Sequence, residues 1–205
     1  MGICLESLVA LVLGYLVGSI PFALVIGKVF YHKDIRQYGS GNLGGGNAGR
    51  VLGRKAGLAV MTLDLLKVTF VIFLTSFLPH GASISVLGGL ATAAGHCYPL
   101  FAHFKGGKAV AAMYGFLFGM ALLQGYGLWI FILPLVVFLV VLYLTKIIAL
   151  GSIVSAVVNT IYIGLVVGSP ILCLASMLFT IVIVIRHRGN LERIRKGTEN
   201  KITWM

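Results

Sequence analysis

The sequence predicts an all-α integral membrane protein with seven transmembrane helices. Hydrophobic residues make up 59 % of the chain, charged residues only 10 %, and the mean hydropathy is +1.04. The basic residues lie between long apolar stretches. Such stretches are typical of membrane spans and not of a soluble core. We expect residues 1–205 to form one membrane-embedded domain.

The charge balance is strongly basic, with 16 Lys and Arg against 5 Asp and Glu and a net charge of +11. In a soluble protein this charge would suggest nucleic acid. Because the basic residues flank apolar spans, they indicate membrane orientation and anionic ligands instead. Cys4, Cys97 and Cys173 are scattered and suggest neither a disulfide framework nor a metal site. We expect no nucleic-acid partner, no metal and no cofactor.

The first three spans are separated by one polar segment and one turn. The first span is predicted over residues 3–29, with a kink at Gly18-Ser19-Ile20-Pro21. The second is predicted over residues 57–78. A turn at residues 79–82 leads to a short third span over residues 83–99.

Two long uncharged stretches supply the other four spans. Residues 109–145 contain no Lys, Arg, Asp or Glu, which is too long for one span of ~20 residues. This stretch breaks at residues 124–127. Residues 147–185 are also uncharged and break at residues 168–170.

Charge selects this count of seven and the orientation. With seven spans, 15 of the 16 Lys and Arg residues share one face, and only Lys67 lies inside a span. The opposite turns hold none. The positive-inside rule then places the N-terminus outside and the C-terminus in the cytoplasm.

Residues 39–50 are the most unusual segment, with six glycines between Gly39 and Gly49. Glycine loses the most backbone freedom on ordering, so we expect this run to form neither helix nor strand. Its N–H groups, together with the side chains of Ser40, Asn42, Asn47 and Arg50, could cradle a phosphate. The alternative is a flexible loop between helices.

Two further basic segments carry similar chemistry. The second ends in Lys105-Gly106-Gly107-Lys108 before the next helix, which favours an anion site although it does not match a P-loop. The third, residues 186–199, could be simply a basic flank of the last span. His187 and Asn190, three residues apart on one helical face, are less easily explained in that way.

Together the three segments are similar to the bacterial acyl-phosphate-dependent glycerol-3-phosphate acyltransferases, over essentially the whole chain. The similarity is carried by residues 39–53, by residues 95–108 and by residues 186–199. It implies transfer of a fatty acyl group from acyl phosphate to the 1-hydroxyl of glycerol 3-phosphate, giving lysophosphatidic acid and phosphate. It also implies a bacterial cytoplasmic membrane protein with its active site on the cytoplasmic face. Membrane lipid is then the surrounding partner, and no obligatory protein partner is implied.

The resemblance assigns roles to particular residues of this chain. Those expected to carry catalysis are Ser40, Arg50, Lys108, His187 and Asn190. Those expected to bind substrate or support the site are Asn42, Gly44, Asn47, His96, Gly106, Gly107 and Glu199. The general base is left open among His187, Glu199 and a phosphate oxygen of the acyl donor.

The chain departs from the family pattern at two places. Family members usually carry Thr at the position of Gly46, and Gly-Val-Ala-Thr where this chain has Ala109-Val110-Ala111-Ala112. The H-x4-D signature of other glycerolipid acyltransferases is absent, because neither Asp34 nor Asp64 follows a His by five.

Two other classes of function remain as alternatives. A transporter for a small phosphate-bearing anion would use the same loops as a gate, and a lipid-binding assembly factor would show no turnover. Inside the spans the sequence places few ionisable groups deeply, Asp64 and Lys67, and shows no clear inverted repeat. These two lie three apart on one helix face, so we expect them to pair.

Overall fold

The structure is a computed structural model that describes residues 5–202, all of them in helices and connecting turns. The chain divides into two compact units, Met1–Gln124 and Gly125–Met205. The all-α prediction is confirmed. The prediction of a single domain over residues 1–205 stays a prediction.

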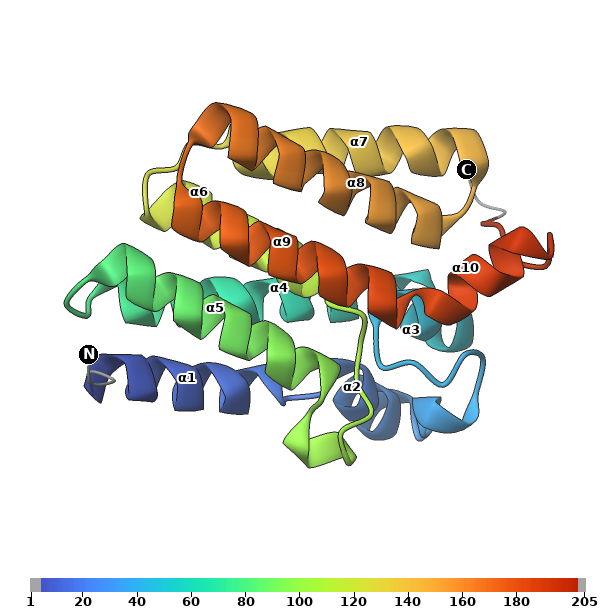
Figure 1. Ribbon diagram of the computed structural model, residues 1–205. Coiled ribbons are helices and arrows are strands. Elements are labelled where there is room, and N and C mark those ends of the chain that lie inside the picture. Colours follow the sequence, from blue (N-terminus) through green and yellow to red (C-terminus); the bar gives the residue numbers. More distant parts are fainter. Residues whose placement is uncertain (1–4, 203–205) are drawn as a thin grey trace. The chain divides into compact units, whose positions relative to one another are not determined.

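The first unit contains six α-helices and two 3-10 turns within the part that the structure describes (Figure 1). In chain order these are α1 (Leu5–Gly18), α2 (Phe22–Tyr31), η1 (Ile35–Gln37), α3 (Gly45–Leu52), α4 (Arg54–Ser76), α5 (Gly81–Cys97), η2 (Leu100–Ala102) and α6 (Val110–Leu123).

Four stretches among residues 5–202 are helical, long and apolar enough to cross a membrane: Leu5–Tyr31, Arg54–Ser76, Gly81–Ala102 and Ile148–Val167. A fifth is added if α9 (Pro170–Arg186) and α10 (Arg188–Arg195), bent by 56° at their junction, are one span. The remaining apolar helices are shorter, at 14 residues for α6 and 17 for Trp129–Thr145.

The predicted kink in the first span is present as a break between α1 and α2. Proline lacks a backbone N–H, so the helix cannot continue regularly through Pro21. The Leu24 N–H donates to the Pro21 carbonyl at 2.9 Å and starts a new helix. Residues 3 and 4, where this span was predicted to start, lie outside the described residues.

Helices α1 and α5 lie side by side because glycines let their backbones approach closely (Figure 1). A Cβ on Gly14 would lie 2.4 Å from the Gly88 carbonyl, and one on Gly18 would lie 2.1 Å from the Thr92 carbonyl. Small residues at a helix contact are typical of membrane proteins. This packing fixes the end of α5, from which the second basic segment departs.

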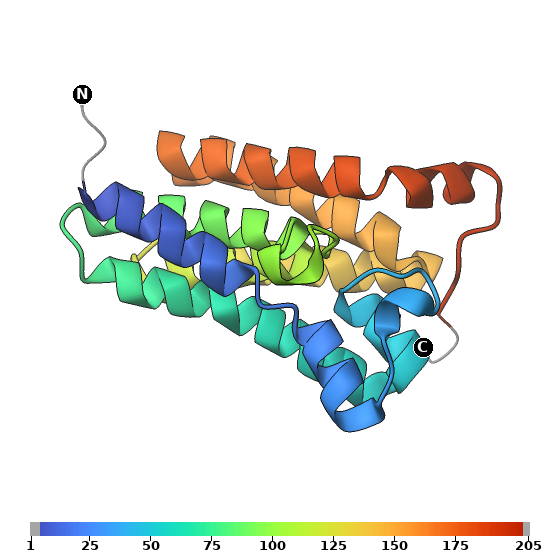
Figure 2. The same ribbon diagram turned by 90° about the horizontal axis from the view of Figure 1, so that it is seen from below.

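The prediction that the glycine-rich run forms no helix is wrong for its second half. Residues Gly45–Leu52 form α3, which packs on the start of α4 (Figure 2). A Cβ on Gly57 would lie 2.6 Å from the Gly49 Cα and 2.9 Å from the Gly45 carbonyl. Close backbone packing therefore outweighs the low helix propensity of glycine, as tertiary context often does.

A small apolar core holds this region together. Its fully buried members come from α2, η1, α3, α4 and η2 and include Ala23, Ile35, Ala48, Val60 and Ala102. The glycine-rich segment is consequently attached to a packed base and is not a free loop.

The second unit consists of α7 (Trp129–Thr145), α8 (Ile148–Tyr162), the π-helical turn η3 (Ile163–Val167), α9 and α10 in the part that the structure describes. The breaks predicted at residues 124–127 and 168–170 are both present. Helices α8 and α9 are joined by hydroxyl contacts, with 2.9 Å from Thr160 Oγ1 to Ser176 Oγ and 2.8 Å from Thr160 Oγ1 to Thr180 Oγ1. Such contacts replace part of the hydrophobic driving force that is missing between helices in lipid.

We predict opposite effects of alanine at two glycines of this region. Gly57→Ala should lower the free energy of unfolding by about 1–3 kcal/mol, because its Cβ has no room against α3. Gly46→Ala should raise it by roughly 0.5–1 kcal/mol, since Gly46 is helical and no described atom lies within 4 Å of its Cβ position. Denaturation in detergent followed by circular dichroism measures both, and equal stability of the two variants would contradict this packing.

Candidate active site

The side chain of Asn47 shapes the segment that carries Ser40. Asn47 is 2 % exposed and comes from the first turn of α3. Its Nδ2 donates to the carbonyls of Ile35 at 3.3 Å and Tyr38 at 3.1 Å. Its Oδ1 accepts from the Ser40 N–H at 2.9 Å. Asn47 therefore satisfies the backbone of the turn, and its amide is used within the protein.

Glycine is required where this turn reverses. Gly39 has a φ of +61° and Gly41 a φ of +66°, both in the left-handed region. A Cβ on Gly39 would also lie 2.3 Å from Asn47 Oδ1. The turn leaves Ser40 exposed, and its hydroxyl makes no hydrogen bond with any other residue in the range 5–202.

Arg50 and Arg36 differ in what their guanidinium groups contact. Arg36 donates through Nε and Nη2 to Asp34 at 2.9 and 2.6 Å. This hydrogen-bonded guanidinium lowers the pKa of Asp34 to about 2, and the same contact raises the pKa of Arg36. Arg50 is exposed on α3 and has no hydrogen bond or ion pair within residues 5–202. Of the two, Arg50 is the cation available to an anionic ligand.

The second basic segment lies against His96 at the end of α5. The Gly107 N–H donates to the His96 carbonyl at 2.9 Å. A Cβ on Gly106 would lie 2.2 Å from that carbonyl, and a Cβ on Gly107 would lie 2.0 Å from His96 Nε2. The two glycines are thus needed for close packing. The Gly107 amide is also engaged within the protein through its bond to the His96 carbonyl.

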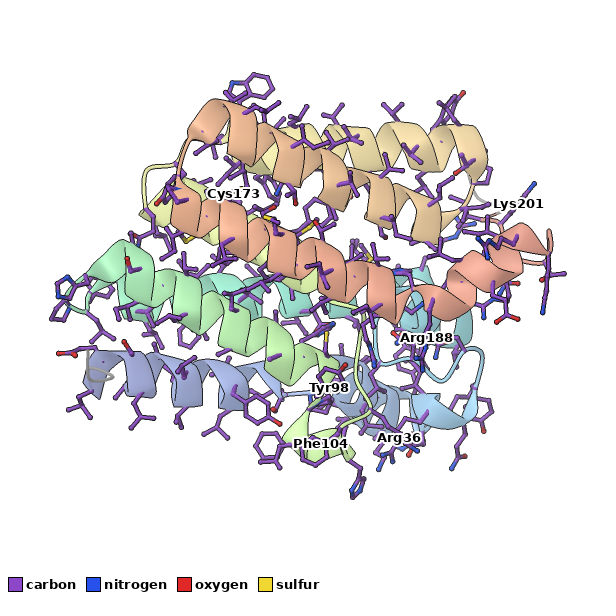
Figure 3. All side chains as sticks on the ribbon, viewed as in Figure 1. Arg36, Tyr98, Phe104, Cys173, Arg188 and Lys201 are labelled. Atoms are coloured by element: carbon purple, nitrogen blue, oxygen red, sulfur yellow. The ribbon has the colours of Figure 1, made fainter. Side chains whose placement is uncertain are left out.

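The chain reaches this glycine pair through a strained turn. His103 and Phe104 follow η2 with φ values of 55° and 59°, which are uncommon for residues other than glycine. Figure 3 shows Tyr98 and Phe104 on the connection between α5 and α6. The Phe104 N–H donates to the Pro99 carbonyl at 2.9 Å and holds the turn closed.

The first and second basic segments meet within the first unit. Asn42 Nδ2 donates to the Gly106 carbonyl at 3.1 Å, across 64 residues of sequence. This bond connects the turn that carries Ser40 with the turn that precedes Lys108. Lys108 lies just before α6, and Ala109, at the helix N-cap, has a φ of +63°.

The third basic segment is organised around Glu199 in the second unit. Asn190 Nδ2 donates to Glu199 Oε1 at 2.7 Å, and Arg193 Nε donates to Glu199 Oε2 at 2.7 Å. The Ile202 N–H donates to the Lys146 carbonyl at 2.8 Å. These bonds hold the chain after α10, where Figure 3 labels Lys201, in one conformation.

His187 lies at the bend between α9 and α10, and not within one helix as its spacing from Asn190 predicted. It is 3 % exposed, and its Nδ1 lies 2.8 Å from the Ile183 carbonyl. Because a carbonyl can only accept, this contact requires a proton on Nδ1.

A cluster that sequence reasoning only partly identified lies beneath the second segment. Lys67 Nζ is 2.7 Å from Asp64 Oδ1, which confirms the predicted pair. His96 Nδ1 lies 3.4 Å from the same oxygen, a contact that the sequence did not indicate. Lys67 Nζ also donates to the Ile20 carbonyl at 3.1 Å, at the break between α1 and α2.

The comparisons with known proteins match almost the whole chain. The family model described as glycerol-3-phosphate acyltransferase matches residues 8–197. The chain belongs to this family. It is 45 % identical over 199 residues to glycerol-3-phosphate acyltransferase 2 of Bacillus anthracis, covering 96 % of this chain and 99 % of the relative. It is also 45 % identical over 195 residues to the glycerol-3-phosphate acyltransferase of Listeria monocytogenes serovar 1/2a, covering 94 % and 95 %.

Two solved structures share the fold of this family member. Both are crystal structures of PlsY (YgiH), an integral membrane glycerol 3-phosphate acyltransferase. The glycerol 3-phosphate form has a TM-score of 0.87 at 30 % identity and covers 96 % of each chain. The lysophosphatidic acid form has a TM-score of 0.84 at 29 % identity, covering 96 % and 95 %. The chain therefore has an all-helical integral membrane fold.

The structure bears on two of the positions that depart from the expected family pattern, Gly46 and Ala109. Gly46 lies on the exposed side of α3, where no described atom would meet a side chain, so Thr and Gly are both accommodated. Ala109 takes a left-handed φ of +63°, which is the conformation that glycine adopts without strain. The glycine usual in relatives at this position thus has a backbone reason.

We predict that the Asn47 side chain is worth more to stability than that of Asn42. Asn47→Ala removes three hydrogen bonds and leaves the Ser40 N–H without its acceptor, while the Ile35 and Tyr38 carbonyls keep one backbone donor each, so it should destabilise the protein by about 2 kcal/mol or more. Asn42→Ala removes one part-buried bond and should destabilise it by roughly 1 kcal/mol. Thermal melting in detergent compares them, and a smaller loss for Asn47→Ala would contradict the bracing role.

Proposed function

We propose that this protein transfers a fatty acyl group from acyl phosphate to the 1-hydroxyl of glycerol 3-phosphate. The products are lysophosphatidic acid and inorganic phosphate. The observation that carries the proposal is the match to the glycerol-3-phosphate acyltransferase family over residues 8–197. The local chemistry supports it, since the Ser40 turn is bonded to α3, which carries Arg50, and the Asn42 side chain links this turn to the segment of Lys108. Both substrates carry phosphate, and such groups bind to cations and fixed donors.

The residues of the site have distinct proposed roles. Ser40, Arg50 and Lys108 hold phosphate groups, and His187 and Asn190 act on the reacting hydroxyl and carbonyl. Asn47 and Glu199 keep these side chains in position, since their polar atoms bond to other parts of the protein. Asn42, Gly44 and the Gly106-Gly107 turn with His96 form the substrate-binding backbone. We keep residues 1–205 as a single proposed membrane-embedded domain.

Acyl phosphate is proposed as the donor because it brings its own base. The hydroxyl of glycerol 3-phosphate loses a proton as it attacks the acyl carbonyl. A phosphate oxygen of the donor lies next to that carbonyl and can take the proton as phosphate leaves. Arg50 and Lys108 stabilise the charge that develops, so catalysis is mainly the positioning of two anions.

The contacts of the carboxylates favour this route over a protein base. In residues 5–202, the four carboxylates of α4 and the basic segments each contact a cation: Asp34, Asp64, Glu192 and Glu199. His187 Nδ1 is used in the contact with the Ile183 carbonyl. The role assigned to His187 is to orient the hydroxyl.

Phosphate release from palmitoyl phosphate by detergent-solubilised protein tests the activity. Release that depends on glycerol 3-phosphate, with lysophosphatidic acid formed in equal amount, is the expected result. A transporter for a phosphate-bearing anion needs sealed compartments and would show no turnover in detergent. The same absence, with lipid binding retained, would indicate an assembly factor.

We predict that Lys108→Ala and His187→Gln differ strongly in turnover. Lys108→Ala removes a full charge beside the phosphate groups and should lose nearly all activity. His187→Gln keeps a hydrogen-bonding group and should retain turnover within about 10-fold, whereas general-base catalysis is worth about 10²–10⁴-fold. The measurement is kcat at saturating concentrations of both substrates. A His187→Gln enzyme that binds both substrates normally but is as inactive as Lys108→Ala would contradict substrate-assisted proton transfer.

We also propose seven spans in the bacterial cytoplasmic membrane, with the N-terminus outside and the active site facing the cytoplasm. Two of the seven proposed spans are the shorter apolar helices α6, of 14 residues, and α7, of 17 residues. Both are shorter than the ~20 residues that are typical of a membrane span. Support comes from the 15 Lys and Arg residues on one side and none in the opposite turns.

Cysteine labelling tests this topology at exposed positions. Gln37→Cys, Lys105→Cys and Lys196→Cys should react with a membrane-impermeant maleimide only in inverted vesicles, and Ser83→Cys only in intact cells. Each of these variants is made in a protein whose native cysteines, Cys4, Cys97 and Cys173, have been replaced, so that only the introduced cysteine can react. Labelling of Gln37→Cys and Lys196→Cys from opposite sides would exclude the seven-span arrangement.

A further inference from the structure

The buried cluster at Asp64 contains more ionisable groups than helix packing requires. Asp64, Lys67 and His96 are 1 %, 5 % and 5 % exposed. Asp64 Oδ1 is close to both Lys67 Nζ, at 2.7 Å, and His96 Nδ1, at 3.4 Å. Asp64 Oδ2 is buried and has no hydrogen-bond partner within residues 5–202. Ionisable groups at such depth in a membrane protein commonly serve a function.

Lys67 has a structural explanation of its own. The break at Pro21 leaves the Ile20 carbonyl without a helical N–H donor, and Lys67 Nζ donates to it at 3.1 Å. Its ammonium also lies 5.5 Å from the centre of the Phe22 ring. Lys67 therefore joins α4 to the break, and Asp64 neutralises it.

His96 is not explained by that pairing. Its ring lies between Asp64 on one side and the Gly106-Gly107 turn on the other. The Asp64 carboxylate faces Nδ1, and the position of a Gly107 Cβ would be 2.0 Å from Nε2. The Gly107 N–H donates to the carbonyl of the same residue. The ring and the carbonyl of His96 together form the surface on which the turn before Lys108 rests.

The arrangement resembles a carboxylate–imidazole pair that activates a nucleophile, but it cannot act in that way. Gly107 covers Nε2 so closely that a methyl group would not fit between them. A general base must come within hydrogen-bond reach of the proton that it abstracts. His96 thus serves as a support and not as a base.

We propose that Asp64 is a positioning residue for acyl transfer, acting through His96 on the Gly106-Gly107 turn and thereby on Lys108. The Asp64 carboxylate accepts from His96 Nδ1 and holds the ring in one rotamer. The ring fixes the position of the Gly106-Gly107 turn, and the turn fixes the position of Lys108 relative to a bound phosphate group. A displacement of about 1 Å at a reacting centre lowers turnover by up to 10²-fold. The proposal rests on the acyltransferase function proposed above.

Two double variants separate orientation from charge. Both replace Lys67 by Met, so that neither leaves an unpaired buried cation. Asp64→Asn/Lys67→Met keeps an oxygen that can accept from His96 Nδ1, whereas Asp64→Leu/Lys67→Met removes it. We expect kcat/KM within about 3-fold of the parent for the Asn pair and a loss on the order of 10- to 100-fold for the Leu pair.

Thr75→Val is the matched structural control. Thr75 Oγ1 contacts Ser85 Oγ at 3.1 Å and joins the same two helices, α4 and α5, at their other ends. The Thr75→Val substitution should lower thermal stability and leave the KM values for both substrates unchanged. A purely structural role of Asp64 would give the Leu pair the same behaviour as Thr75→Val.

Gly107→Ala identifies the affected step. Its methyl group must displace the turn from His96, so the substrate whose KM rises in Gly107→Ala should be the one whose KM rises in the Leu pair. Because both changes act on one turn, combining them should not multiply their effects. Multiplied effects, or a rise in KM for different substrates, would overturn the proposal.

Hydrogen exchange at the Gly107 amide tests the same link without turnover. The bond to the His96 carbonyl protects this amide, so exchange in the peptide over residues 103–109 should accelerate in the Leu pair and not in the Asn pair. Equal exchange in the two pairs would overturn the role of Asp64. A parent protein that exchanges as expected but releases no phosphate would instead contradict the proposed function.

Discussion

The buried carboxylate of Asp64 is the constraint around which the first unit is arranged. A charge at this depth is tolerated only with a partner, and Lys67 lies one turn along α4 at 2.7 Å. Lys67 in turn donates to the Ile20 carbonyl that the break before Pro21 leaves exposed. One rotational setting of α4 satisfies both contacts. The same setting brings Asp64 to His96, and so connects the membrane helices to the segment that carries Lys108.

The first two basic segments are held in place by hydrogen bonds within the protein. The Ser40 turn is held by Asn47, the Gly107 turn by the His96 carbonyl, and the Asn42 amide joins the two. Polar groups that could be mistaken for substrate ligands are thus part of the scaffold. This leaves the exposed Arg50 guanidinium and Ser40 hydroxyl as groups that substrates can engage. A rigid arrangement of this kind suits a reaction in which the substrates supply most of the chemistry.

The third basic segment, in the second unit, is likewise held in place by hydrogen bonds within the protein. Glu199 receives hydrogen bonds from Asn190 and Arg193, and the Ile202 N–H reaches the Lys146 carbonyl. Residues that look like a basic flank in the sequence are therefore ordered by their own contacts. The Glu199 carboxylate fixes the Asn190 and Arg193 donors, and His187 Nδ1 contacts a backbone carbonyl.

The sequence by itself determined the apolar segments, their breaks at Pro21, residues 124–127 and residues 168–170, and the family, because these depend on composition, local breakers and motif order. It also indicated the Asp64–Lys67 pair, since residues three apart on a helix share a face. Only the tertiary structure decided that Gly45–Leu52 is helical and that His96 joins Asp64 to Gly107. Both depend on which backbones approach closely. Close approach between segments distant in sequence is set by packing, which no local pattern of residues records.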